Sequence, residues 1–167
     1  LLSRRQRQMC IETGLSASKN FLLIISDKTN YDRGILNWEI EKAVDYYELP
    51  IIIAYPGYSK IGAPSELNSM WTKSLAERIK NERAHCIHIP LKKEPIFDAI
   101  NQFSVVNSKY PKGGALGCYS KEAYKSWGIF SNVKTSFGLY AILGTIWVQQ
   151  LCNHINKIQN RIKMMRF

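Results

Sequence analysis

A glutamate, Glu39, stands directly after Trp38 in the segment "ILNWEIEKAV", shortly after a polar loop that opens with Ser26, Asp27 and Thr29. A carboxylate in such a place can bind ribose hydroxyls or stabilise the positive charge that develops on an anomeric carbon during glycosyl transfer. It also fits a simpler role, because an acid early in a helix interacts favourably with the helix dipole and is usually solvated. The spacing of the residues leaves both interpretations open.

These side chains must be positioned by buried strands and by the helices between them. Continuous apolar runs with polar residues at both ends are typical of strands in a parallel sheet with both faces covered. Apolar side chains at helical spacing, such as Leu36, Ile40 and Val44, indicate helices between these runs. The predicted strands are residues 20–27, 49–57 and 84–91, and the predicted helices are residues 35–48, 64–82 and 93–103. This alternation predicts an α/β domain with a parallel sheet.

The carboxyl ends of parallel strands are where ligands bind in open α/β sheets. Ser26, Asp27 and Thr29 follow the first predicted strand, and Tyr55 begins the segment "YPGY" at the end of the second. Glu39 falls in the first turns of the following helix, within reach of the same edge. We therefore predict that these residues line one site, with Trp38 as either a packing residue or a stacking surface.

The predicted sheet is small, because only three strands are evident while doubly wound sheets usually contain about five or six. The chain opens at Leu1 inside a basic, helix-like segment. We therefore expect the domain, residues 1–133, to be incomplete at its N-terminus. A missing central strand would leave the strand at residues 20–27 with an open edge that another element has to cover.

Residues 134–167 form a separate segment, which is apolar at first and then basic. No charged residue occurs from Thr135 to Asn153, and the segment contains no acid. This pattern predicts a long C-terminal helix that packs on the domain or supports self-association. A membrane-surface or spanning helix within residues 135–153 is one alternative, although its polar residues make the length borderline. An unfolded C-terminus is the other.

The composition excludes several function classes. The net charge is +10, which favours solubility or attraction to anions, but no zinc-finger spacing or RNA-binding motif is present, so we predict no nucleic-acid partner. The cysteines form no CxxC pair, which is typical of a reduced cytoplasmic protein. His85 and His88 alternate to opposite faces of a strand and predict no metal site.

The segment from Ser18 to Lys60 resembles the TIR-like domain of the Thoeris antiphage defence family, the ThsB subunit, and more loosely TIR domains in general. The matching features are the apolar strand with its polar loop, Trp38-Glu39-Ile40 with Ala43, and the proline-led strand from Pro50 to Tyr55. The similarity extends over roughly residues 16–103. It implies a flavodoxin-like fold.

This resemblance implies that the intact protein cleaves NAD between nicotinamide and ribose, with NAD as the substrate and no further cofactor. It also implies that the matching glutamate, Glu39, is essential, and that an ADP-ribose-type messenger activates a separate effector protein. Orienting the ribose and stabilising an oxocarbenium-like charge would be the protein's main tasks. The family's first strand and its loop have no counterpart in these residues, so we expect weak or no catalysis from this chain alone.

Two other functions are kept as alternatives. One is a non-catalytic TIR-like module that assembles through its helices, its basic surface and its C-terminal segment. The other is an enzyme similar to nucleoside deoxyribosyltransferases, which share the sheet and also use a glutamate. Turnover of NAD, turnover of nucleosides, or neither would separate the three.

Overall fold

The computed structural model of the chain describes residues 4–29, 34–105 and 114–129. The chain divides into two compact units, Leu1–Asn132 and Val133–Phe167, and the described residues all lie in the first. The predicted C-terminal helix at residues 134–167 and the possible membrane segment at residues 135–153 therefore lie outside the described residues. None of the helices that the structure describes is both long enough and apolar enough to cross a membrane.

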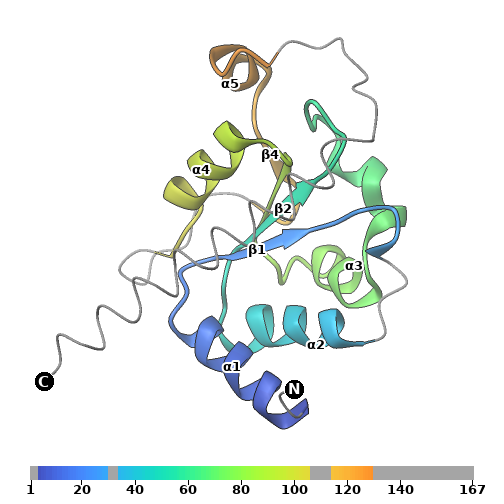
Figure 1. The fold of residues 1–167 in the computed structure, drawn as a ribbon. Coiled ribbons are helices and arrows are strands. Elements are labelled where there is room, and N and C mark those ends of the chain that lie inside the picture. Colours follow the sequence, from blue (N-terminus) through green and yellow to red (C-terminus); the bar gives the residue numbers. More distant parts are fainter. Residues whose placement is uncertain (1–3, 30–33, 106–113, 130–167) are drawn as a thin grey trace, which may run out of the picture. The chain divides into compact units, whose positions relative to one another are not determined.

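A parallel sheet forms the centre of the described residues, in the order β1-β2-β3-β4 (Figure 1). The strands are β1 (Phe21–Ile24), β2 (Ile51–Tyr55), β3 (Cys86–Pro90) and the short β4 (Gly117–Cys118). Phe21 pairs with Ile51 and Ile51 in turn pairs with Cys86, so the three longer strands run in register. The predicted parallel α/β sheet is confirmed, and β4 adds a short fourth strand to the three that were predicted.

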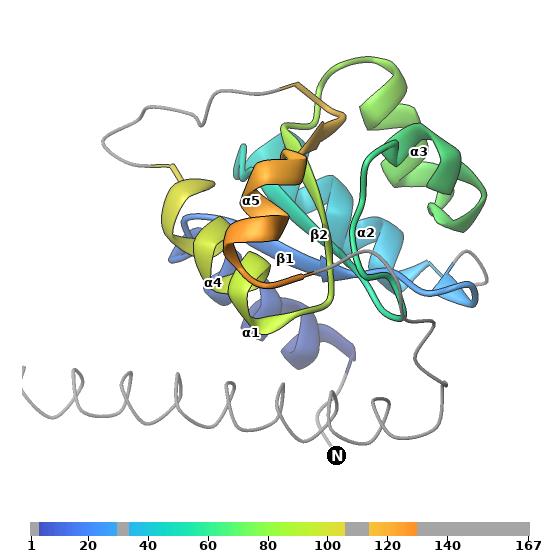
Figure 2. The ribbon, with the colours of Figure 1, turned by 90° about the horizontal axis from the view of Figure 1, so that it is seen from above.

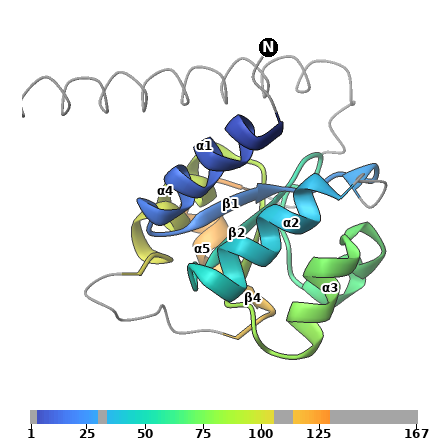
Figure 3. The same ribbon diagram turned by 90° about the horizontal axis from the view of Figure 1, so that it is seen from below.

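Helices cover both faces of this sheet. They are α1 (Arg4–Ser16), α2 (Ile35–Glu41), α3 (Lys73–Lys80), α4 (Lys93–Gln102) and α5 (Lys121–Ser126). On β2, Ile51 and Ile53 share a core with residues of α2 and α3, whereas Ile52 and Ala54 share one with residues of α4. Figures 2 and 3 show the two faces, with α4 nearer the viewer in one and α2 with α3 in the other. Every residue of β2 is buried, and its side chains point alternately to the two faces of the sheet. The strand therefore packs against the helices on both sides.

The helix predicted at residues 35–48 is only partly α-helical. After Glu41 it widens into a π-helical turn, η2 (Lys42–Tyr46), in which the N–H of Tyr47 donates to the carbonyl of Lys42 at 3.0 Å. The apolar pattern did not distinguish the two forms, since Ile40, Ala43 and Val44 are buried as the stripe requires. Such wide turns are rare and short.

The helix predicted at residues 64–82 is interrupted. A 3-10 helix, η3 (Pro64–Met70), comes first, and Trp71 is then extended, with φ −76° and ψ 143°. Thr72 begins α3, because its hydroxyl accepts a hydrogen bond from the N–H of Leu75 at 3.4 Å. Threonine is a favoured N-cap, so one residue inside an apolar stripe starts a new helix.

The strand β1 lies at one end of the strand order, next to β2. All four of its side chains are buried or half-buried, on both faces, although it has a neighbour on one side only among the described strands. The prediction that a strand preceding residue 1 completes the sheet on this side is not tested by the described residues.

Candidate functional site

The loop after β1 holds three of the predicted site residues, and two of them close the loop on itself. The N–H of Ser26 donates to the hydroxyl of Thr29 at 2.8 Å, and the N–H of Thr29 donates to the carbonyl of Ser26 at 3.1 Å. Asp27, between them, is exposed. All three thus lie at the carboxyl end of β1, with Asp27 as the side chain most open to a ligand.

Glu39 lies in the middle of α2, which begins after Gly34 in a left-handed conformation, φ 97°. The flank of α2 that faces α3 is fixed by hydrogen bonds, since the N–H of Ser74 donates to Asn37 at 3.0 Å and the Ser74 hydroxyl donates to Glu41 at 3.2 Å. Glu39 is two positions from Asn37 and therefore falls on the opposite flank. It is half-buried there, a position in which a carboxylate is partly withdrawn from water.

A surface pocket of about 470 Å³ lies between α1 and the start of the π-helical turn. Trp38, the neighbour of Glu39, is one of the residues that line this pocket. The remaining lining residues are polar or flexible side chains: Arg5, Gln8, Met9 and Glu12 from α1, and Lys42 from η2. The four α1 residues stand at positions i, i+3, i+4 and i+7, so they form one stripe of that helix.

The chemistry of this α1–α2 pocket suits a planar ring with an anionic group. Trp38 offers an aromatic face, and Arg5 offers a guanidinium, which binds phosphate or carboxylate well. Lys42 is already paired with Glu12 at 3.2 Å and lies 5.0 Å from the centre of the Tyr46 ring. Sequence reasoning missed Arg5 and Lys42, because the approach of α1 to α2 is a tertiary contact that no local pattern announces.

Tyr55 is fully buried and does not reach the surface in this structure. Its hydroxyl accepts a hydrogen bond from the indole N–H of Trp71 at 2.8 Å and lies 2.8 Å from Nδ1 of His88. Nε2 of His88 lies 3.1 Å from the carbonyl oxygen of Ala115. Because that oxygen only accepts, Nε2 must donate, and Nδ1 accepts from Tyr55. The three rings form a directed relay that joins η3, β2 and β3.

Burial sets the protonation of this relay. It lowers the pKa of His88 to about 4, although the hydrogen bond to Ala115 opposes the shift, and His88 is neutral at pH 7. Burial also raises the pKa of Tyr55 well above its usual value. The hydroxyl of Tyr55 is buried and makes its hydrogen bonds within this relay. Tyr55 therefore fits a role in the core better than the nucleotide-binding role that was expected from its place at the strand end.

No group of three or more His, Cys, Asp or Glu side chains that could hold a metal ion occurs within residues 4–29, 34–105 and 114–129. The cysteines at positions 10, 86 and 118 are free, and Cys86 is buried in β3. The candidate site thus consists of Glu39, the α1–α2 pocket beside it, and the loop after β1.

Comparison with protein families gives a match over the first part of the chain. Residues 3–61 match the model of the Thoeris protein ThsB, TIR-like domain. The resemblance seen in the sequence extended over roughly residues 16–103, whereas the match begins at residue 3 and ends at residue 61. The matched residues include β1, α2 with Glu39, and β2. No curated protein sequence matches the chain.

Proposed function

From the match of residues 3–61 to the TIR-like domain of the Thoeris protein ThsB, we propose that this chain contributes the catalytic carboxylate of an NAD-cleaving domain. In this proposal Glu39 stabilises the positive charge that develops on the ribose as nicotinamide leaves. The observation on which the proposal chiefly depends is that the matched residues include Glu39 and the strands on either side of its helix. The product would be an ADP-ribose-type messenger for a separate effector in antiphage defence.

The surroundings of Glu39 support this role in chemical terms. A half-buried carboxylate acts in a medium of lower dielectric constant than water, where its attraction for a developing cation is stronger. Trp38 and Arg5, in the neighbouring pocket, would hold an aromatic base and a phosphate of the dinucleotide. Asp27, exposed at the end of β1, would accept hydrogen bonds from ribose hydroxyls.

The decisive experiment compares nicotinamide release from NAD by the intact protein that carries this chain and by its Glu39→Gln variant, which removes the charge and keeps the size. We expect release by the variant to fall by roughly 100-fold or more, as for loss of one preorganised stabilising group. Glu77→Gln is the matched control, because Glu77 is an exposed glutamate on α3, and its release should equal that of the unaltered chain. Liquid chromatography of the products measures both.

Three results would contradict the proposal. Release that survives in Glu39→Gln would assign the chemistry to another group. Cleavage of nucleosides in place of NAD would favour the deoxyribosyltransferase-like alternative. If the intact protein turns over neither substrate while it self-associates, the non-catalytic interaction module replaces the enzyme.

A further inference from the structure

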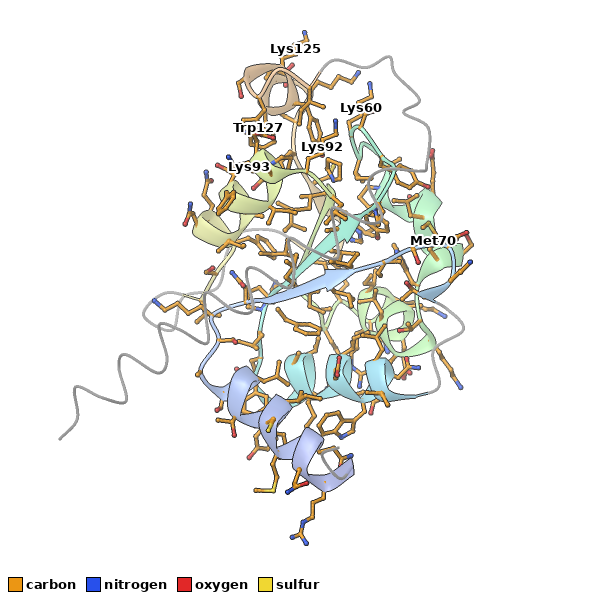
Figure 4. The ribbon with its side chains drawn as sticks, viewed as in Figure 1. Lys60, Met70, Lys92, Lys93, Lys125 and Trp127 are labelled. Carbon is orange, nitrogen blue, oxygen red and sulfur yellow. The ribbon has the colours of Figure 1, made fainter. Side chains whose placement is uncertain are left out.

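Five lysines gather where β2, β3 and β4 end, and we call this set the lysine rim: Lys60, Lys92, Lys93, Lys121 and Lys125. They come from the loop after β2, from the start of α4 and from α5. Figure 4 shows four of them, Lys60, Lys92, Lys93 and Lys125, around one end of the sheet together with Trp127. None of them lines the α1–α2 pocket.

The framework beneath the rim is fixed by hydrogen bonds. The N–H of Leu91 donates to the carbonyl of Tyr55 at 2.9 Å, which holds the start of α4 beside the loop after β2. The hydroxyl of Tyr124 bonds to both the N–H and the carbonyl of Ile61, at 3.3 and 3.4 Å, so α5 is fastened to the same loop. Three segments far apart in sequence therefore hold their lysines in a defined arrangement.

The rim lysines, like Lys19, Lys73 and Lys80, form no ion pair within the described residues, and they are distinguished from those lysines by lying together where the strands end. Lys42, Arg78 and Arg83 form ion pairs with acids of α1 and η2. No ion pair within the described part of the chain involves a rim lysine.

Two glutamates, Glu94 and Glu122, are the acids within these segments. Hydrogen bonds from its own N–H and from Ser120 lower the pKa of Glu122, with Lys125 and Lys121 as weaker causes. The rim therefore retains a surplus of positive charge.

Two further features of the rim suit a phosphate ligand. The helix α4 begins at Lys93, and no side chain caps its first N–H groups, so the positive end of its dipole adds to the lysines. Trp127, half-buried, packs against Tyr119 with ring centres 4.9 Å apart, and Tyr58, 38% exposed, lies on the loop that bears Lys60. Aromatic faces beside ammonium groups can bind a base and its phosphates together.

We propose that the lysine rim binds a nucleoside di- or triphosphate. Several ammonium groups, each a compact charge with three donors, would contact the phosphates, and Trp127 or Tyr58 would contact the base. This site is separate from the one proposed around Glu39, and it would allow a nucleotide to bind the domain without being cleaved.

The test measures binding of ADP by isothermal titration calorimetry at low salt and again at 0.3 M salt. The variant changes Lys60, Lys92 and Lys125 to glutamine. The control changes Lys19, Lys73 and Lys80, which are exposed lysines outside the rim, and has the same net charge. We expect the rim variant to bind ADP at least about tenfold more weakly than the unaltered chain, the control within about twofold, and added salt to weaken binding. Circular dichroism checks that both variants fold.

Other ligands decide the chemistry. Inorganic diphosphate that binds with a smaller affinity than ADP supports a contact with the base as well as with the phosphates. Three results would overturn the proposal: no saturable binding of ADP, equal loss in rim variant and control, or a single-stranded RNA that binds far more tightly than ADP at the same lysines. Because Glu39→Gln leaves the rim intact, its ADP binding should be unchanged, so failure of one proposal is distinguishable from failure of the other.

Discussion

The contact of η2 with α3 and the lysine rim show two ways in which this molecule uses its basic residues. Where η2 contacts α3, Arg78 is buried and its guanidinium contacts Asp45. The same guanidinium donates to the carbonyl and the hydroxyl of Ser74 at 3.0 and 2.6 Å. At the second, the lysines form no ion pair within the described residues. The difference is that cations paired with acids hold elements together, whereas the rim lysines, which form no ion pair within the described residues, are the ones proposed to bind an external anion.

In the buried relay of Tyr55, Trp71 and His88, every polar group is hydrogen-bonded within the core. Protonation of His88 at low pH should lower the free energy of unfolding more than any of the substitutions considered below. The folded chain keeps His88 neutral with a pKa of about 4, whereas the unfolded chain takes up a proton near pH 6.5. The contribution of His88 to stability is therefore constant above pH 6.5, falls as the pH drops from 6.5 to 4, and levels off below pH 4. The total loss is about 3 kcal/mol, at 1.36 kcal/mol for each unit of pKa shift.

Urea unfolding at a series of pH values measures this loss. His88→Gln should flatten the dependence between pH 6.5 and 4, because the titrating group is gone. His85 is half-buried and directly precedes β3. The variant His85→Gln should keep the pH dependence of the unaltered chain. A dependence that persists unchanged in His88→Gln would show that another group is responsible.

Replacement of Arg78 by methionine tests the compensated junction and should have an intermediate effect. It removes the hydrogen bonds to Asp45 and Ser74, and we expect the free energy of unfolding to fall by about 2 kcal/mol. Arg83 also pairs with Asp45, at 3.0 Å, but 58% of its side chain is exposed. Arg83→Met should therefore cost about 0.5 kcal/mol. Chemical denaturation compares the two, and equal losses would remove the distinction between buried and exposed partners.

The lysine rim should show the smallest effect on stability. Changing Lys60, Lys92 and Lys125 to glutamine breaks no ion pair of the described residues, so we expect the free energy of unfolding to change by less than about 0.5 kcal/mol. Thermal melts measure the change, and a loss comparable to that of Arg78→Met would mean that the rim has a structural role.

The layered fold was predictable because burial leaves a strong mark on sequence. Ile51, Ile52 and Ile53 are apolar on both faces, which only a covered strand requires, and the segment is β2 in the structure. The break at Trp71 and Thr72 was missed because an apolar stripe continues across it, and the capping hydroxyl of Thr72 resembles any other helical threonine. The wide turn after Glu41 was missed for the same reason, since its buried residues keep helical spacing.

The candidate site was predictable only where one local segment determines it. Glu39 and the loop from Ser26 to Thr29 follow directly from the end of β1. Tyr55 was assigned from its place at a strand end, but its parity with Ile51 and Ile53 directs it into the core, a signal that was present in the sequence. The α1–α2 pocket and the lysine rim join residues that are distant in sequence, and only the tertiary packing brings them together.

The relay of rings also provides a built-in reporter. The indole N–H of Trp71 is held by Tyr55 in the interior, so it exchanges with deuterium only when that part of the core opens. Its proton resonance should consequently persist in heavy water far longer than those of exposed amides. The slow disappearance of that one signal would time the opening of the molecule's centre without any added label.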